Sequence, residues 1–351
     1  MEEATVEDPG MDQVVRFGIV GFGFAFGDDQ DVGEVAGSYV TDPERIVRWG
    51  YRTFHRAPDG VTATALATAA ARDAFGRLDV TADDVDLVVV ATSEMPEYPY
   101  WDSSASLARE LKIRETQTLL LTEGCASGVT GLGMVAGLLA IQPELQTVLF
   151  VAVNRVSEFH RNRMNVNNSV HSDGAVAAVL RRGHDGCRWL ATDQLTDPEL
   201  CDWFRTDHGG AVSPVPPPGW SSATAPSGTE TVQAHFRKDP QRLQAFGKLL
   251  NDRVLAVIDG ACRRAGVTRD QVARLVYIND PDGIDDLAQL CGLPVERTNR
   301  ELAVRHGHMG SADQLVSLGQ HIERGEVASG DLVALCGISI GMRWYCTLVR
   351  V

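Results

Sequence analysis

The sequence predicts an α/β protein made of two similar halves, and three observations support this prediction. Short apolar runs without polar alternation are typical of strands that are covered on both faces. Patterns typical of helices separate these runs, and such an alternation indicates an α/β architecture. Related segments also recur in the same order along the chain, which indicates an internal duplication. The 351 residues are 44% hydrophobic and 23% charged, as in ordinary globular proteins.

The predicted strands are the apolar runs at 15–23, 85–93, 118–122, 147–153, 175–180, 273–279, 332–339 and 344–351. The predicted helices are 63–74, 129–141, 242–265 and 312–322, where apolar residues recur every three or four positions. The segment 205–232 differs because it is rich in Pro, Ser and Gly. We expect a long surface excursion there, either a flexible loop or a wall at the entrance to a site.

The duplication rests on three pairs of segments. They are 80–90 with 267–277, 123–132 with 306–315, and 175–182 with 344–351. Their common order predicts an N-terminal half over 1–183 and a C-terminal half over 184–351. The second pairing sets Gly124-Cys125 opposite Gly307-His308. If the halves are related by a pseudo-two-fold axis, this thiol and this imidazole would face each other across it.

Charge and cysteine usage limit the partners and the compartment. The 32 basic and 47 acidic residues give a net charge of −15, which argues against nucleic acid and anionic membranes as partners. The acidic segment 1–13 lacks the apolar core of a signal peptide, and we expect no membrane-spanning run. The seven cysteines form no CxxC pair. We therefore expect a cytoplasmic protein without a metal site.

Cys125 is the strongest candidate for catalysis. It lies in Glu-Gly-Cys-Ala-Ser-Gly (123–128), after a predicted strand and at the start of a predicted helix. The N-terminal end of a helix favours the ionised thiol, and small neighbours let a substrate approach the sulfur. The backbone N–H of Cys125 can also face a developing oxyanion. We interpret the other cysteines as buried apolar residues.

With these segments in order, the chain resembles the ketoacyl synthase III-like enzymes of the thiolase fold. The matching segments are VRFGIVGFG, VDLVVVATS, GCASG, HSDGAVAAVL and ISIGMRWYCTLVRV. The resemblance implies two duplicated halves with mixed sheets in a layered α/β/α/β/α arrangement. It also implies a homodimer, a cysteine that accepts the acyl group, and no metal or redox cofactor. The acyl donor would be the phosphopantetheine thioester of a carrier protein, or coenzyme A.

The sequence departs from the condensing members of this family at two places. Those members carry a histidine just after the strand predicted here at 273–279, where this chain has Asn279 or Asp280. They carry an asparagine further on, where this chain has His308 within HGHMGSAD. We therefore expect His308 to act with Cys125, oriented by Asn279 or Asp280. The resemblance places the second oxyanion-hole N–H near Ile340, in the closing glycine turn.

These departures favour simple acyl transfer. Decarboxylative condensation needs two strong donors around a developing enolate, whereas acyl transfer needs a thiolate, a base and an oxyanion hole. The GHMGSADQL stretch also resembles the family's natural-product acyltransferases. We expect transfer of a polyketide-derived or aromatic acyl group to an alcohol, an amine or a carrier thiol. The alternatives are a condensing enzyme and a catalytically silent partner subunit.

Three further groups receive secondary interpretations. Asp313 is interpreted as an acid in the first turn of a helix rather than as a member of the site. The aromatic segment 94–102 is expected to line the acyl pocket or to pack at a dimer contact, with equal weight. Arg161 and Arg163 lie near His160. They would form a local basic patch for an acidic carrier protein, or a solvated loop.

Overall fold

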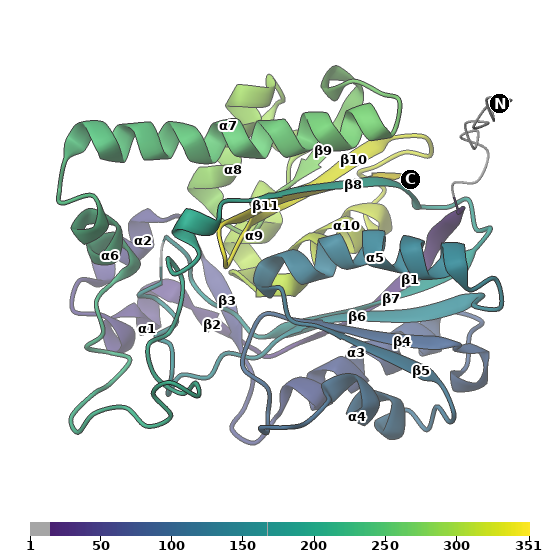
Figure 1. The fold of residues 1–351 in the computed structure, drawn as a ribbon, viewed down its shortest axis with the longest axis horizontal. Coiled ribbons are helices and arrows are strands. Elements are labelled where there is room, and N and C mark those ends of the chain that lie inside the picture. The colour runs from purple at the N-terminus through teal and green to yellow at the C-terminus, as the bar shows by residue number, and fades with distance from the viewer. Residues whose placement is uncertain (1–14, 167) are drawn as a thin grey trace, which may run out of the picture.

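The protein is described by a computed structural model that covers residues 15–166 and 168–351. The predictions about the segment 1–14 therefore lie outside the described residues. Figure 1 shows a layered molecule in which helices and strands alternate from one side to the other. Helix α7 covers one set of strands, helix α5 lies in the middle, and helices α3 and α4 cover the other set.

The N-terminal part contains seven strands and five α-helices in the described range. The elements are β1 (Phe17–Phe26), β2 (Asp28–Asp31), α1 (Val32–Tyr39), α2 (Pro43–Arg48), β3 (Thr53–Arg56), α3 (Ala63–Arg77), β4 (Leu87–Thr92), α4 (Ser103–Glu110), β5 (Gln117–Leu121), α5 (Ser127–Ile141), β6 (Thr147–Asn154) and β7 (Gly174–Arg182). The short helical turn η3 (Gly124–Ala126) precedes α5. Strands β2 and β3 form a small separate sheet.

The C-terminal part has a similar arrangement, with a 25-residue helix, α7, over its strands. Its elements are β8 (Arg188–Thr196), α6 (Gly228–His235), α7 (Pro240–Arg264), β9 (Val272–Val276), α8 (Pro281–Cys291), α9 (Arg300–His306), α10 (Asp313–Glu323), β10 (Leu332–Ser339) and β11 (Arg343–Arg350). The turn η7 (Gly310–Ala312) precedes α10 as η3 precedes α5.

The main sheet has the order β5-β4-β6-β7-β1-β8-β11-β10-β9. The N-terminal part has two parallel pairs, β5 with β4 and β4 with β6, followed by the antiparallel pairs of β6 with β7 and β7 with β1. The C-terminal part has one parallel pair, β9 with β10, followed by the antiparallel pairs of β10 with β11 and β11 with β8. The parts meet at β1 and β8, whose register contains the single pair Gly18 and Arg188. The predicted boundary at 183–184 falls in the turn between β7 and β8.

One predicted alignment is wrong in register. Gly124 and Gly310 each begin the turn before a central helix, and both have positive φ, 64° and 54°. Cys125 is therefore equivalent to Ser311, three residues beyond the His308 that the sequence pairing set opposite it. The two repeats differ in the segment just before the turn. This local difference causes the error in the predicted register. The expectation that a thiol and an imidazole converge does not depend on this equivalence.

The central helices α5 and α10 fill the space between the two sets of strands. Apolar residues of α5 pack there with side chains from β6, β7 and β10, among them Leu132, Phe150 and Leu335. The stretch Gly124–Ile141 is long and apolar enough to cross a membrane, but 61% of it is buried inside the protein. Its composition is that of a core helix packed between the two sets of strands of the main sheet.

The excursion predicted at 205–232 ends earlier than expected. Residues 205–227 are largely irregular, but α6 begins at Gly228. Ser227 accounts for this start, because its hydroxyl accepts a hydrogen bond from the N–H of Glu230 while the carboxylate of Glu230 bonds back to Ser227. Strand β8 was not predicted, because its sequence RWLATDQLT mixes polar and apolar residues.

Candidate active site

Cys125 lies in the η3 turn between β5 and α5. A positive φ at Gly124 bends the chain there, and a Cβ at this position would lie 2.6 Å from the side chain of Ile340. Ser339 fixes the turn, because its hydroxyl accepts from the N–H of Ala126 at 3.1 Å and donates to the carbonyl of Glu123 at 2.8 Å. The end of β10 therefore holds the start of α5 in place.

His308 is held by backbone contacts between the two halves. Its N–H donates to the carbonyl of Val170 at 2.7 Å, and its carbonyl accepts from the N–H of Ser172 at 2.8 Å. Gly307, with φ of 66°, makes the turn that brings His308 to this position from the end of α9. The buried imidazole thus lies beside a segment that comes before β7 in the other half.

The structure brings Cys125 and His308 together. The thiol sulfur lies 3.3 Å from Nε2 of His308, and Nδ1 of the same ring lies 2.6 Å from Oδ2 of Asp313. Burial lowers the pKa of His308, but Asp313 and Cys125 outweigh burial and hold that pKa well above its usual value. This arrangement favours an imidazolium next to the sulfur of Cys125.

Asp313 is the residue that orients His308, so the interpretation of Asp313 as only a first-turn acid is wrong. Besides the imidazole, its fully buried carboxylate accepts the N–H groups of Met309 at 2.6 Å and Asn279 at 2.7 Å. Three donors therefore fix this carboxylate. The spacing between His308 and Asp313 matches neither a helix nor a strand, because the η7 turn lies between them.

The expectation that Asn279 or Asp280 orients His308 is correspondingly wrong. The amide of Asn279 donates to the carbonyl of Gly307 at 2.7 Å and accepts from the amide of Asn299 at 3.0 Å. Asn279 therefore supports the loop that carries His308, and its side chain makes no hydrogen bond to the ring. Asp280 lines the same cavity as Cys125 and His308.

Asp280 is an unusual carboxyl group. It is the residue before α8, and its Oδ1 is buried without a hydrogen-bond partner. Burial raises its pKa to about 6, although the backbone of Gly283 acts in the opposite direction. Carboxyl groups with a raised pKa in a cleft are candidates for function.

His171 is a second histidine in the site that the sequence reasoning missed. Its ring meets that of His308 edge-on, with 5.2 Å between centroids, and its Nε2 is buried without a partner. Burial, together with His308 and the nearby arginines, lowers the pKa of His171 well below its usual value. The sequence predicted a strand at 175–180 within the motif HSDGAVAAVL. His171 is the first residue of this motif and precedes the strand.

Ile340 lies in the hairpin between β10 and β11, which closes through Gly341 and Met342, both with positive φ. Its side chain is 39% exposed and, like Cys125, lines the cavity. This places Ile340 beside the Cys125 turn. The role of its N–H as an oxyanion-hole donor stays a prediction.

The cavity above Cys125 has a volume of ≈ 380 Å³. One wall is apolar and partly aromatic, with side chains from α7, β10, the β10–β11 hairpin, the segment after β9 and the segment before the excursion: Trp203, Phe204, Leu243, Phe246, Leu250, Tyr277, Ile278, Ile338 and Met342. The other side is polar and holds His171, Asp280 and His308. The site therefore has separate surfaces for an apolar acyl chain and for a polar group.

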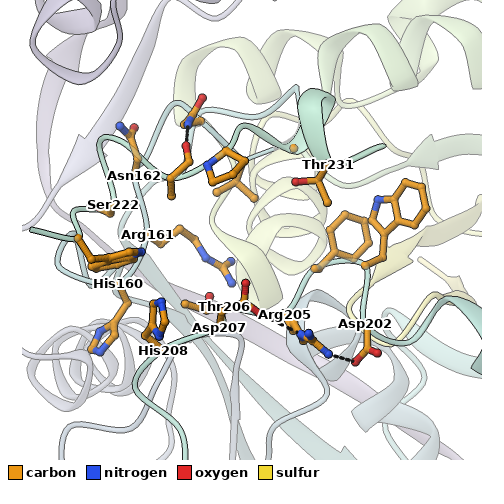
Figure 2. A pocket seen from close by; sticks show the side chains of 18 residues that line it. His160, Arg161, Asn162, Asp202, Arg205, Thr206, Asp207, His208, Ser222 and Thr231 are labelled. Carbon is orange, nitrogen blue, oxygen red and sulfur yellow. Dashed lines mark hydrogen bonds and ion pairs between the residues drawn. The ribbon is translucent and has the colours of Figure 1, made fainter. Parts of the chain in front are cut away.

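A second, outer cavity of ≈ 330 Å³ shares five lining residues with the first, namely Arg161, Val166, Trp203, Phe204 and Gly228. Figure 2 shows Arg161 reaching into it, with Thr206 and Asp207 of the excursion nearby. Trp220 and Ser222 also line it. The segment predicted as a loop or an entrance wall therefore forms a wall of the approach to Cys125.

Two secondary expectations are corrected. Arg163 is fully buried and makes two hydrogen bonds to Asp173, so it does not form a docking patch. Arg161 is 20% exposed and pairs with Glu94 at 3.7 Å. Of the aromatic segment, Tyr98 and Tyr100 are exposed and do not line the cavity above Cys125, so for these two residues only the alternative of a dimer contact stays a prediction.

The comparisons with known proteins agree with this geometry. The family model of 3-oxoacyl-[acyl-carrier-protein (ACP)] synthase III matches residues 121–198, and the model of its C-terminal part matches 262–351. These ranges contain Cys125, His171, Asp280, His308 and Asp313. The chain is therefore similar to the 3-oxoacyl-ACP synthase III-like proteins of the thiolase fold.

Relatives and solved structures of this family extend over nearly the whole chain. The beta-ketoacyl-ACP synthase III of Sinorhizobium medicae (strain WSM419) is 28% identical over 330 residues, 90% of this chain and 93% of the relative. ChlB3, an acyltransferase of known structure, has a TM-score of 0.80 at 23% identity and covers 96% of this chain and 98% of its own. Synthase III from Thermus thermophilus has a TM-score of 0.76 at 22% identity, with coverages of 95% and 99%. These structures confirm the predicted α/β thiolase fold.

Members of the 3-oxoacyl-ACP synthase III-like family are enzymes that condense or transfer acyl groups. A thiol, an imidazole and a carboxylate in hydrogen-bonding sequence suit that chemistry, because the base activates the nucleophile and the carboxylate orients the base. In the described part of the chain, no group of three or more His, Cys, Asp or Glu side chains is arranged to hold a metal ion.

Proposed function

We propose that the protein is an acyltransferase that carries its acyl group on Cys125. The donor is a thioester of an acyl carrier protein or coenzyme A, and the acceptor is an alcohol, an amine or a carrier thiol. The observation that carries this proposal is the chain of contacts from Cys125 through His308 to Asp313. No metal or redox cofactor enters the reaction.

The reaction runs in two steps. The Cys125 thiolate attacks the donor carbonyl, the carbon–sulfur bond of the donor breaks, and His308 gives its proton to the departing thiol. His308 then takes the proton of the acceptor as the acceptor attacks the acyl-enzyme. Asp313 keeps Nδ1 of His308 protonated and Nε2 aimed at the sulfur in both steps. The N–H groups of Cys125 and Ile340 stabilise the oxyanion in this proposal.

The cavity supports an apolar or aromatic acyl group. Phe246 and Leu250 of α7, together with Tyr277, form a wall suited to such a chain. Burying apolar surface there contributes about 25 cal/mol for each Å² removed from water. A polyketide-derived or aromatic acyl group fits this wall, and we propose that the protein acts in cytoplasmic secondary metabolism as a homodimer.

Decarboxylative condensation is the second candidate. It is favoured by the names of the curated relatives, which are synthases, and by the second imidazole that His171 sets beside His308. Against it, the pKa of His171 is lowered by its burial, so the ring is a weaker donor to a developing enolate than a charged group.

The first test is loading of Cys125. Incubation with an acyl N-acetylcysteamine thioester is expected to add one acyl mass to the intact protein, because the thiolate is the acyl acceptor. Cys125→Ala is expected to stay unmodified, while Cys201→Ala, which removes an exposed cysteine, loads normally. An unmodified wild-type protein would point to the silent partner subunit, and loading of Cys125→Ala would refute the covalent mechanism.

The second test separates transfer from condensation. The loaded enzyme is offered a malonyl thioester, and headspace carbon dioxide and the product mass are measured. We expect neither carbon dioxide release nor a product extended by two carbons, because the site holds one charged imidazole rather than two strong donors. Release of carbon dioxide together with the extended product would replace the transferase proposal by the condensing one.

A further inference from the structure

Two buried polar atoms in the cavity wall have no partner within the protein. They are Oδ1 of Asp280 and Nε2 of His171, and both residues line the cavity that contains Cys125 and His308. Buried polar groups in folded proteins are nearly always hydrogen-bonded. An unpaired carboxylate oxygen and an unpaired ring nitrogen beside a nucleophile therefore mark a place where a ligand donates hydrogen bonds.

The two oxygens of Asp280 have different surroundings. A Cβ on Gly283 would lie 2.7 Å from Oδ2 of Asp280, so that oxygen lies against the first turn of α8. The other oxygen, Oδ1, is the unpaired one. The start of α8 thus explains the position of Oδ2, whereas Oδ1 is available to accept a hydrogen bond from a ligand.

The charges around the cavity favour a cationic ligand at this point. Arg161 is engaged by Glu94, and the imidazolium of His308 is engaged by Asp313. Once His308 has passed its proton to the departing donor thiol, the ring is neutral and Cys125 is capped by the acyl group. Among the described residues that line the cavity, the carboxylate of Asp280 is then without a cationic partner. A protonated amine complements it.

His171 supplies the second contact. It is neutral near pH 7, because burial lowers its pKa, and a neutral imidazole has one nitrogen that accepts a hydrogen bond. Its ring lies edge-on to that of His308. A hydroxyl bound between these two rings would lie beside the base that removes its proton.

We propose that Asp280 and His171 form the acceptor subsite and that the acceptor is an amino alcohol. Asp280 binds its ammonium group, and His171 helps to hold its hydroxyl group. The hydroxyl oxygen then bonds to the acyl carbon on Cys125, the carbon–sulfur bond breaks, and the hydroxyl proton passes through His308 to the sulfur. This inference rests on the proposed acyl transfer, and it assigns the acceptor class.

The test uses a matched pair of acceptors. Wild-type enzyme is loaded with an acyl N-acetylcysteamine thioester, excess donor is removed, and loss of the acyl mass is followed after addition of trans-2-aminocyclohexanol or cyclohexanol. We expect the amino alcohol to remove the acyl group at least roughly tenfold faster, the size of one charge-assisted hydrogen bond. Asp280→Asn is expected to abolish this preference, so that both acceptors remove the acyl group at similar rates.

The control is Asp282→Asn, an exposed neighbour in α8 that does not line the cavity; it is expected to keep the preference. His171→Phe keeps an aromatic ring but removes its nitrogens, and it is expected to slow the reaction with both acceptors. The inference is overturned if wild type shows no preference, if Asp280→Asn retains it, or if Asp280→Asn slows loading instead, which would assign Asp280 to the donor.

Failure of the inference can be distinguished from failure of the proposed function. Loading is measured first, and an enzyme that does not load refutes acyl transfer by itself. Binding of the same two probes to the unloaded enzyme is then measured by ligand-observed NMR. Stronger binding of aminocyclohexanol to wild type than to Asp280→Asn supports the subsite, and equal binding overturns it.

Discussion

At the scale of single residues, the reactivity of Cys125 depends on a carboxylate that does not touch it. Asp313 lies 2.6 Å from Nδ1 of His308 and is fixed by two backbone N–H groups. It raises the pKa of His308 against the effect of burial. Because a raised histidine pKa keeps the ring charged until the pH rises through that value, the sulfur of Cys125 has a positively charged neighbour across the neutral range.

Asp313→Asn is therefore expected to shift the pH profile of Cys125 alkylation. Without the carboxylate, the pKa of His308 falls, so the imidazolium beside Cys125 is lost at lower pH. Alkylation by iodoacetamide near pH 7 should slow by roughly tenfold for each unit by which the pKa of His308 falls below 7. Glu323→Gln, at the exposed end of the same helix, serves as the control. An unchanged profile in Asp313→Asn would contradict this role.

The site could be predicted from the sequence only in part, and the reason lies in these residues. Cys125 was found because small residues, a strand and a helix start surround it in the sequence. The contact with His308 was expected, but its orienting partner was assigned to the wrong loop. Asp313 follows an η7 turn, and His171 precedes a strand across the other half. Neither position has a periodic pattern, because each depends on contacts between segments far apart in the chain.

At the scale of elements, the crossing of α5 with the η7 turn sets the distance between nucleophile and base. A Cβ on Gly128 would overlap the carbonyl oxygen of Ser311 in the other half. By contrast, Gly137 in the same helix has no atom near its missing Cβ. Of these two glycines in α5, only Gly128 is required for the close approach of α5 to the η7 turn.

Gly128→Ala is expected to destabilise the protein and to slow loading, because the added methyl group separates Cys125 from His308. Overpacking of this kind costs about 1–3 kcal/mol. Gly137→Ala is expected to stabilise the helix by up to about 1 kcal/mol, because alanine replaces glycine in an open position. Thermal unfolding and acyl loading measure the two effects. A Gly128→Ala protein as stable and active as Gly137→Ala would show that the contact does not set the site.

The elements themselves were predicted more fully than the site. The apolar strands β4, β6, β7 and β10 were found because they are buried on both faces. Strand β8 was missed, because it carries polar residues such as Thr192, whose hydroxyl bonds to that of Thr347 on β11 at 2.7 Å. A strand whose polar groups are satisfied by a neighbouring strand leaves little hydrophobic pattern to read.

At the scale of the whole molecule, the net charge of −15 has a consequence for a carrier-protein donor. We expected local arginines to offset it, but Arg163 is buried in ion pairs and Arg161 is paired with Glu94. The overall field therefore opposes the approach of an acidic partner, and salt screens such a field.

Raising the ionic strength from about 0.01 M to about 0.15 M, which shortens the screening length to about 8 Å, is expected to lower the KM for an acyl carrier protein. The KM for the neutral N-acetylcysteamine thioester should change little, which provides the control. Steady-state kinetics at the two salt concentrations measure both. A carrier-protein KM that rises with salt would reveal an attractive patch elsewhere on the surface.

The equivalence of Cys125 and Ser311 has an evolutionary consequence. A duplicated chain starts with two identical helix starts, yet here one carries the nucleophile while the hydroxyl of the other lies 3.1 Å from the carbonyl oxygens of Ala91 and Val153. Those carbonyls belong to the opposite half. Each half is therefore required for the structure of the other half, and substitutions at these helix starts are constrained in both. Selection therefore acts on the two halves together. This explains how the repeats can lose most of their sequence similarity while their strand order stays the same.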